Sequence, residues 1–448
     1  KQNIKTGGIT METNVAGQKK GSFIGFIPLI TFLVVYFAMG IFTGDFSKFP
    51  LLIGMFLATA ISLVISSPVA KKLSFEEKVT LFCTGGGDNT LILMVVIYML
   101  AGAFYGVAGA MHATDTVTNL GISILPAQLI LPGLFLIGCI LSFSMGTSMG
   151  TVSALMPIAL SIAMKTNVSV PLVCGIVVGG AMFGDNLSFI SDTTIAATTT
   201  QNISMKAKFK ANVMMVIPAF LITLIGLAFW PINATTIDMT GNVDLVNLIP
   251  YVLIILLSIV GVHVIPAMGI SILSGVVIGI IHGDFSFVDS FGIVHKGMTW
   301  MQDMAIIAIF VGGVIAMMKY LGGIDWLLNT LGKRTKSRKG AELSIAALVS
   351  LVDVATTNNT MAIIACGPIA KDISEKYKIP AARTASILDL FSSAFNGLTP
   401  YAGQLLVAGA MAEISPVSIM PYVWYSILMA VFGVIFILTG FQSDKNFE

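Results

Sequence analysis

Two polar stretches interrupt long apolar segments in the first half of the chain. The first is Gly146-Thr-Ser-Met-Gly-Thr151, and the second, Gly-Asp-Asn-Leu-Ser-Phe-Ile-Ser-Asp-Thr-Thr, runs from Gly184 to Thr194. Hydroxyls and carboxylates are costly in hydrocarbon, and irregular backbone is tolerated there only where protein or a water-filled cavity surrounds it. We therefore predict a binding site, with these first-half candidates: Thr147, Ser148, Thr151, Asp185, Asn186, Ser188, Ser191 and Asp192.

The second half of the chain repeats this arrangement. Pro157 and Pro368 stand in matching Pro-Ile-Ala sequences 211 residues apart, and the same offset aligns Asp185 with Asn396. It also aligns the first polar tip with the polar stretch around Asn359. Self-similarity at a fixed offset indicates an internal repeat. The second-half candidate ligands are therefore Thr357, Asn358, Asn359, Thr360, Asn396 and Thr399.

These residue types suit a hard cation bound beside a carboxylate. Carbonyl, hydroxyl and amide oxygens outside a helix ladder are the ligands that such cations prefer. Burial and a neighbouring cation act in opposite directions on a carboxyl pKa, so a proton and a sodium ion can compete for one group. We predict a Na+ site at Asp185, Thr147 and Asn358, and proton coupling at Asp185 and Asp353. Asp389 is a weaker candidate; neither Asp353 nor Asp389 has a nearby lysine in the sequence.

Two apolar segments carry helix start signals after a polar break. Ser191-Asp192 precedes Thr193, and Thr399 is followed by Pro400, which are typical of an N-cap and a first helical turn. A half-helix that starts in mid-membrane presents its positive end to an anion, and the half-helix before it presents carbonyls to a cation. Both breaks therefore predict a broken transmembrane helix.

The same residues have structural interpretations. Serine and threonine in membrane helices commonly bond their own backbone, and glycines allow close packing. For Asp192 the alternative to a ligand is a helix cap with no binding role. Arg383 is expected to anchor a helix end at the cytoplasmic face. Polar tips at matching positions in both halves favour binding, because polar residues inside a membrane are rare without a function.

Composition places the chain among polytopic helical membrane proteins. Hydrophobic residues make up 56% of the 448 and charged residues 10%, against about a quarter charged in soluble domains. The net charge of +2 and the absence of a basic stretch interleaved with aromatics exclude a nucleic-acid partner. Four scattered cysteines and four scattered histidines lack metal-ligand spacing, so we expect no cofactor. We expect the natural protein to start at Met11, with Lys1 to Thr10 as an addition before it.

Lysines and arginines predict the orientation of the apolar segments. They gather at 19–20, 71–78, 206–210, 333–339 and 371–378, and are missing from the loops at 112–125, 231–245 and 412–420. The positive-inside rule makes the basic groups and both termini cytoplasmic. The spanning-length segments lie at 23–42, 50–67, 89–111, 126–144, 147–164, 169–200, 211–230, 246–262, 264–281, 303–321, 342–370, 381–411 and 421–441.

The fold predicted from this pattern is all-α, with two inverted-topology repeats. Each repeat has a re-entrant hairpin, at 126–164 from outside and at 342–370 from inside, and a broken helix. We expect a cytoplasmic tail at 1–22, repeats at 23–230 and 246–441, an external linker at 231–245 and a cytoplasmic tail at 442–448. The hairpins and broken helices would move together against a scaffold of 23–67 and 246–281.

The motifs resemble those of the NhaC family of sodium/proton antiporters. The similar pieces are Gly146-Thr-Ser-Met-Gly-Thr151 and the stretch from Gly180 to Thr194, while Thr357-Asn-Asn-Thr360 resembles the tips of sodium/dicarboxylate symporters more loosely. The resemblance covers nearly the whole apolar part. It implies a secondary transporter of a bacterial-type cytoplasmic membrane, with Na+ and H+ as ions, the lipid bilayer as its surroundings, and a homodimer.

Two transport functions stay open, and a third class is disfavoured. The first is Na+/H+ antiport by alternating access; the second is Na+- or H+-coupled transport of a small organic anion or amino acid, as in malate/lactate exchange. An intramembrane aspartyl hydrolase would need two carboxyls sharing one proton. The repeat pairs Asp185 with Asn396, so we predict a transporter and not an enzyme.

Overall fold

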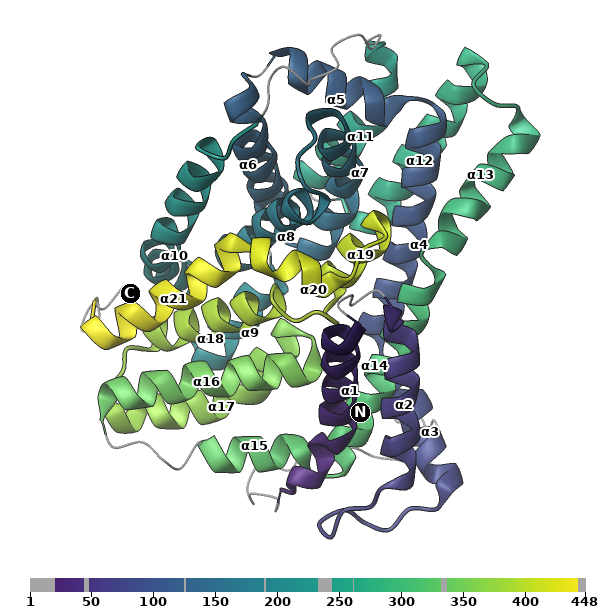
Figure 1. Cartoon of the computed structure of the whole chain (residues 1–448). Helices are drawn as coiled ribbons and strands as arrows, with labels where there is room; N and C mark the ends of the chain where they lie inside the picture. The colour runs from purple at the N-terminus through teal and green to yellow at the C-terminus, as the bar shows by residue number, and fades with distance from the viewer. Residues whose placement is uncertain are drawn as a thin grey trace, which may run out of the picture.

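The computed structural model describes residues 21–43, 48–124, 126–188, 191–232, 244–260, 262–331 and 337–441, and within these ranges every regular element is a helix. Figure 1 shows the arrangement. The predicted all-α membrane class is confirmed. Eight of the described helices are long and apolar enough to cross a membrane, or nine if the bent pair Gly403–Ala412 and Pro416–Tyr422 forms one span.

The two halves contain helices in the same order. The first half has η1 (Phe23–Phe26), α1 (Ile27–Thr43), α2 (Leu51–Val64), α3 (Phe75–Gly86), α4 (Asn89–Ala110), α5 (Ala113–Ile124), α6 (Ala127–Met145), α7 (Ser148–Thr166), α8 (Val170–Leu187), α9 (Asp192–Gln201) and α10 (Met205–Ala228). The second half has η4 (Leu245–Leu248), α11 (Ile249–Ile259), α12 (Val264–His282), α13 (Phe287–Trp300), α14 (Gln302–Tyr320), α15 (Gly323–Leu331), α16 (Arg338–Thr356), α17 (Asn359–Tyr377), α18 (Ala381–Asn396), α19 (Gly403–Ala412), α20 (Pro416–Ile419), η5 (Met420–Tyr422) and α21 (Trp424–Thr439).

The repeat is visible in the residues that end the helices. The chain turns into the left-handed region after α7 at Asn167 (φ 52°) and after α17 at Lys378 (φ 54°), again 211 positions apart. Asn202 and Glu413 do the same after α9 and α19, each with φ 54°. A left-handed residue is a common way to end a helix, because it lets the last carbonyls find donors. The two halves therefore share their local turn geometry, although their side chains differ.

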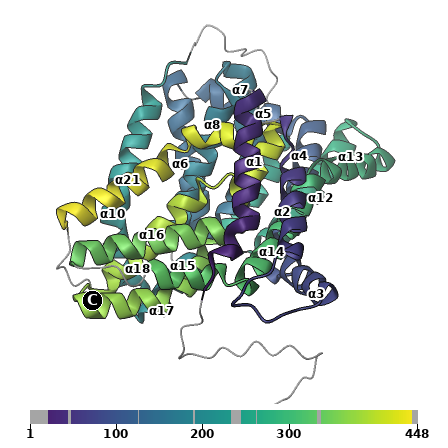
Figure 2. The ribbon, with the colours of Figure 1, turned by 60° about the horizontal axis from the view of Figure 1, so that its bottom comes forward.

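The halves interlock through matching contacts. Helix α4 packs on α13, and its counterpart α14 packs on α3; likewise α9 packs on α17 and α19 packs on α7. The α4–α13 contact is so close that a Cβ at Gly102 would lie 2.1 Å from the Gly297 carbonyl oxygen, so glycine is required there. Figure 2 shows α16, α17 and α18 grouped together, away from α12 and α13. Each broken helix is thus held by the hairpin of the other half.

The predicted apolar segments became helices with some differences. The segment 342–370 is the helical pair α16 and α17, and 126–164 is the pair α6 and α7. Four shorter helices were not predicted, because polar residues break their apolar runs: α3, α5, α13 and α15. Lys19, Lys20, Lys333 to Lys336, most of the 231–245 linker and the chain ends lie outside the described residues.

Candidate functional site

Two helical hairpins have tips of the same construction. In the first, Gly146 ends α6 with φ 65° and Thr147 leads into α7. In the second, Thr357 ends α16 with φ 52° and Asn358 leads into α17. The first helical residues of the second arms are Ser148 and Asn359, so equivalent polar side chains stand at the two tips.

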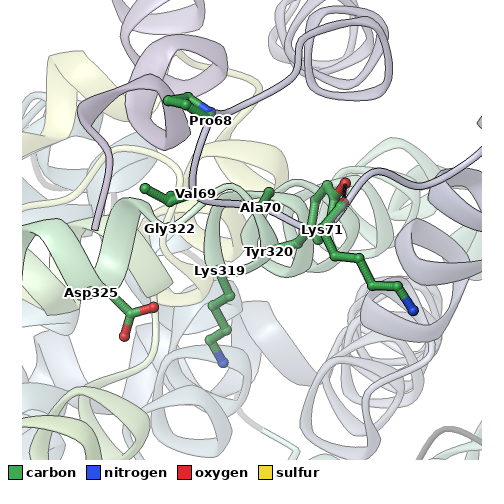
Figure 3. Close-up of a pocket in the computed structure, with 8 residues that line it drawn as sticks. All are labelled: Pro68, Val69, Ala70, Lys71, Lys319, Tyr320, Gly322 and Asp325. Atoms are coloured by element: carbon green, nitrogen blue, oxygen red, sulfur yellow. Dashed lines mark hydrogen bonds between the residues drawn. The ribbon is translucent and has the colours of Figure 1, made fainter. Parts of the chain in front are cut away.

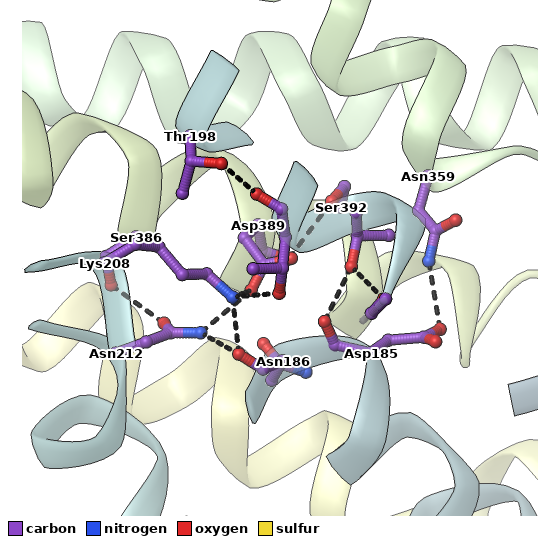
Figure 4. Close-up of polar contacts among 12 residues, drawn as sticks. Asp185, Asn186, Thr198, Lys208, Asn212, Asn359, Ser386, Asp389 and Ser392 are labelled. Atoms are coloured by element: carbon purple, nitrogen blue, oxygen red, sulfur yellow. Dashed lines mark hydrogen bonds and ion pairs between the residues drawn. The ribbon is translucent and has the colours of Figure 1, made fainter. Parts of the chain in front are cut away.

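Both tips meet one carboxylate. Asp185 lies near the end of α8 and is 4% exposed. Its Oδ2 accepts hydrogen bonds from Ser148 Oγ at 2.7 Å and from Asn359 Nδ2 at 3.1 Å. Figure 4 shows the Asn359 amide directed at the Asp185 carboxylate. A side chain from each repeat therefore holds Asp185 at the place where the repeats meet.

Both restarted half-helices also bond residues of this cluster, although neither bonds the carboxylate itself. Thr193, in the first turn of α9, donates from Oγ1 to the Asp185 carbonyl oxygen at 2.6 Å. Gln404, in the first turn of α19, donates from Nε2 to Ser148 Oγ at 2.9 Å. The N-terminal turns of α7, α9, α17 and α19 thus converge here. A helix N-terminus carries partial positive charge, so helix starts near a buried carboxylate favour its charged form.

A second buried cluster lies directly behind the α8 to α9 break. Lys208 of α10 and Asp389 of α18 form an ion pair of 2.7 Å, with side chains 1% and 0% exposed. Asn212 donates from Nδ2 to Asp389 Oδ2 at 2.8 Å and to the Asn186 carbonyl oxygen at 2.7 Å. Figure 4 shows these side chains beside the end of the Asp185 helix. The break is therefore tied to both repeats by charged and amide groups.

Two further buried acids have different surroundings. Asp353, near the end of α16, accepts a hydrogen bond from Asn396 Nδ2 at 3.2 Å through Oδ1, and its Oδ2 has no partner among the described residues. Glu342 pairs with Arg383 at 3.0 Å, and both are buried. Arg383, in the first turn of α18, is 1% exposed and donates to Glu342 and, at 3.1 Å, to the Phe441 carbonyl just after α21. It therefore joins helix ends, and its predicted position at the cytoplasmic face stays a prediction.

Several predicted ligands bond their own backbone. Thr151 donates to the Thr147 carbonyl at 3.0 Å, and Thr399 donates to the Phe395 carbonyl at 2.8 Å. Helix α19 begins at Gly403, so the predicted start at Thr399-Pro400 is wrong. These hydroxyls satisfy a helical carbonyl, which is the common role of such residues in membrane helices.

The other predicted ligand residues have three kinds of surroundings: one caps a helix, several form local hydrogen bonds or are buried, and one is exposed. Asn358 Oδ1 accepts from Met361 N at 2.9 Å and so caps α17. Asn359 Oδ1 accepts from Thr360 N at 3.0 Å, Ser191 Oγ lies 2.8 Å from Thr193 Oγ1, and Asn186 Nδ2 donates to Met182 O at 2.9 Å. Ser188 and Asn396 are buried, whereas Asp192 is exposed at the start of α9.

Sequence reasoning missed Lys208 and Gln404. Lys208 was grouped with Lys206 and Lys210 in a cytoplasmic loop, but α10 begins at Met205 and buries it, so its loop position is wrong. Asp389 has no lysine near it in the sequence, but the fold brings Lys208 to it. The signal was the spacing from Lys208 to Asn212, since residues four apart share a helix face. Gln404 stands 211 residues after Thr193, so the repeat offset could have found it.

A cavity of about 530 Å³ lies elsewhere, where the segment before α3 meets the end of α14. Figure 3 shows Lys71, Lys319 and Asp325 among its lining residues. None of the predicted ligands lines it, so it is separate from the Asp185 cluster.

Comparison with known proteins shows which protein family the chain resembles. The sequence model of the Na+/H+ antiporter family matches residues 18–232 and again 232–441. The malate-2H(+)/Na(+)-lactate antiporter of Bacillus subtilis (strain 168) is 21% identical over 92% of this chain and 94% of its own length. The Na(+)/H(+) antiporter NhaC of the same organism is 27% identical over 79% and 84%. The Alcanivorax borkumensis YdaH transporter structure aligns with 95% of this chain and 100% of its own, at 15% identity and a TM-score of 0.41. Because the family model matches both halves, the predicted two-repeat organisation is confirmed, and the chain belongs to the Na+/H+ antiporter family.

Proposed function

We propose that this transporter exchanges Na+ for H+ across the cytoplasmic membrane by alternating access, with Asp185 as the exchange site. One observation carries the proposal: Ser148 and Asn359, which are equivalent residues of the two repeats, donate to the same carboxylate oxygen. A group held by both repeats changes its surroundings when the repeats exchange conformations. The family membership and the NhaC relative support the same activity.

In the proposed cycle, a proton and a sodium ion bind the Asp185 carboxylate in turn. Ser148, Asn359 and the Gln404 amide surround it, and Gln404 Oε1 is a buried oxygen without a partner in the described part of the chain. In the proposed sodium site the ligands are the Asp185 carboxylate and Ser148 Oγ, and Asn359 holds the carboxylate through Nδ2. Ser148 and Asn359 replace the predicted Thr147 and Asn358, because Asn358 already caps a helix. Asp353, whose Oδ2 has no hydrogen-bond partner among the described residues, is the proposed second proton carrier.

The proposed orientation keeps both termini cytoplasmic and makes the two hairpins re-entrant. The mobile unit would consist of α6 to α9 and α16 to α19, which carry Asp185 and the groups bonded to it. The scaffold would include α1 and α2, which pack on each other and on α14, and α11 and α12, which pack together. The matching contacts between halves support two mirrored conformations of similar energy, as alternating access requires.

Coupled transport of a small organic anion is the second candidate. The observation that favours it is the pair of amide donors in this cluster: Asn359 Nδ2 donates to Asp185 and Gln404 Nε2 donates to Ser148. Amides in the first turn of a helix also suit a substrate carboxylate. The relative named as a malate-2H(+)/Na(+)-lactate antiporter supports this candidate.

Purified protein in liposomes tests the two candidates against each other. An imposed sodium gradient should drive a change in internal pH, measured with an entrapped dye, when no organic solute is present. The control repeats the assay with a panel of carboxylates and amino acids. Proton movement that appears only with a solute would reject simple antiport and select the second candidate, and no movement under either condition would reject both.

Replacing the adjacent asparagines should separate binding from folding. Asn359→Ala removes a hydrogen bond to a charged group, an interaction that contributes roughly 1.5–3 kcal/mol, so we expect the apparent sodium affinity to fall by about tenfold. Asn358→Ala removes a helix cap and should cost about 1 kcal/mol of stability while leaving the affinity near wild type. Thermal unfolding and sodium titration measure both effects, and the opposite pattern would assign the ligand role to Asn358.

A further inference from the structure

The Lys208 ammonium occupies a cage of three oxygen atoms. It donates to the Asn186 carbonyl at 2.6 Å, to Thr194 Oγ1 at 2.8 Å and to Asp389 Oδ2 at 2.7 Å. An ammonium has three protons, so every one of them has an acceptor. The acceptors come from the end of α8, the start of α9 and the middle of α18, and thus from both repeats.

The composition of this cage is that of a site for a hard monovalent cation. It combines a carboxylate, a hydroxyl and a main-chain carbonyl that has left the helix ladder, which are the oxygen ligands that such ions take. Lysine places a compact charge at the end of a flexible stem. Nζ therefore lies where a free ion would be coordinated by the same atoms.

The cage is held together without the lysine. Asn212 donates to the Asn186 carbonyl at 2.7 Å and to Asp389 Oδ2 at 2.8 Å, and so joins two of the three ligands. Ser386 donates to Asn212 Oδ1 at 2.8 Å, which fixes the orientation of that amide. Removing the Lys208 side chain should therefore leave these two oxygens in place.

We propose that the α8 to α9 break contains a second cation site, formed by Asn186 O, Thr194 Oγ1 and Asp389 Oδ2, in which Lys208 is a permanently tethered cation. When the ammonium is removed, the site takes a mobile Na+ or a small alkylammonium ion. In the native protein the tether fills the site throughout the cycle. Asp389 therefore exchanges no ion. Of the two carboxylates beside the α8 to α9 break, Asp185 is the one that can bind a mobile cation.

The test measures cation-dependent stability of detergent-purified variants, all carrying Asp185→Asn so that the proposed exchange site does not contribute. Lys208→Ala empties the cage, and its unfolding temperature should rise with the logarithm of Na+ or methylammonium concentration at constant ionic strength. Lys208→Met places a methyl group next to the cage, and this variant should show no such rise. The double variant Lys208→Ala, Asp389→Asn lacks the carboxylate and should also show none.

The other buried ion pair provides a matched control. Arg383 and Glu342 are equally buried, but Glu342 pairs with Arg383 and Arg338, so Arg383→Ala should be destabilised without rescue by either cation. A Lys208→Ala protein that folds but responds no more than its parent would overturn the proposal. If Lys208→Ala folds only in added Na+ or methylammonium, the proposal is supported. If the Lys208→Ala protein does not fold even with Na+ or methylammonium, while the Lys208→Ala, Asp389→Asn protein folds, the proposal is wrong. None of these outcomes depends on transport, so they are independent of the proposed antiport.

Discussion

Asp185→Asn is expected to reduce sodium-driven proton movement in proteoliposomes to the background of empty vesicles. A neutral amide cannot release a proton in exchange for a cation. The change preserves size, and the amide oxygen can still accept the hydrogen bonds that Ser148 and Asn359 now donate to the carboxylate. The protein should therefore fold and insert normally, and the loss should be one of exchange and not of yield.

The control for this variant is a surface carboxylate. Asp284 is exposed in the turn after α12, so Asp284→Asn should exchange ions at the wild-type rate. A correctly folded Asp185→Asn protein with undiminished exchange would remove Asp185 from the mechanism and leave Asp353 as the remaining proton candidate.

The fold was predictable where it depends on patterns along the chain. Apolar segments of spanning length predicted most of the long helices. The matching sequences at Pro157 and Pro368 predicted the internal repeat. The helices missed are those whose apolar runs are short, such as α5 and α15, because their burial comes from neighbours that hydropathy does not reveal. Likewise Thr399 was a good start signal by residue type, yet its hydroxyl bonds to Phe395 and the helix starts four residues later, at Gly403.

The site was predictable in its parts but not in its assembly. The offset aligned Ser148 with Asn359, but only the packing of α9 on α17 and of α19 on α7 brings both tips to one carboxylate. The choice between Asn358 and Asn359 depends on where the helix begins: the residue before the first turn caps it, and the next one points at Asp185. Neither distinction can be read from residue types.

The repeats are alike in backbone and unlike in charge. Asp185 corresponds to Asn396 and Lys208 to Ile419, at the same offset of 211 residues. A symmetric fold supplies two equivalent conformations, whereas a single ion site needs only one set of charged side chains. We infer that the second repeat supplies amide donors to the cluster, namely Asn359 and Gln404, while the first supplies Asp185, the carboxylate proposed to bind Na+.

Locking the scaffold to the mobile unit should stop turnover. Tyr36 of α1 and Ser415, in the bend between α19 and α20, lie with their hydroxyl oxygens 2.7 Å apart. This contact joins a helix of the proposed scaffold to the chain directly after α19 of the proposed mobile unit. With both residues replaced by cysteine, and the exposed Cys83 replaced by serine, a reducible bifunctional thiol reagent should join them. Alternating access requires the two parts to move past each other, so exchange should fall to background and return after reduction.

The matched control joins two helices that both lie outside the proposed mobile unit. Tyr105 of α4 and Trp300 of α13 have ring centroids 4.7 Å apart, and the same reagent across cysteines there should leave exchange near its starting rate. Sodium binding to the locked Tyr36–Ser415 protein should persist on whichever side is open, because the cross-link touches none of the groups that hold Asp185. If the locked protein exchanged ions at the normal rate, the moving-unit proposal would fail. The opening motion would then have to be local, at the hairpin tip between Gly146 and Thr151, where the left-handed glycine already breaks the helix.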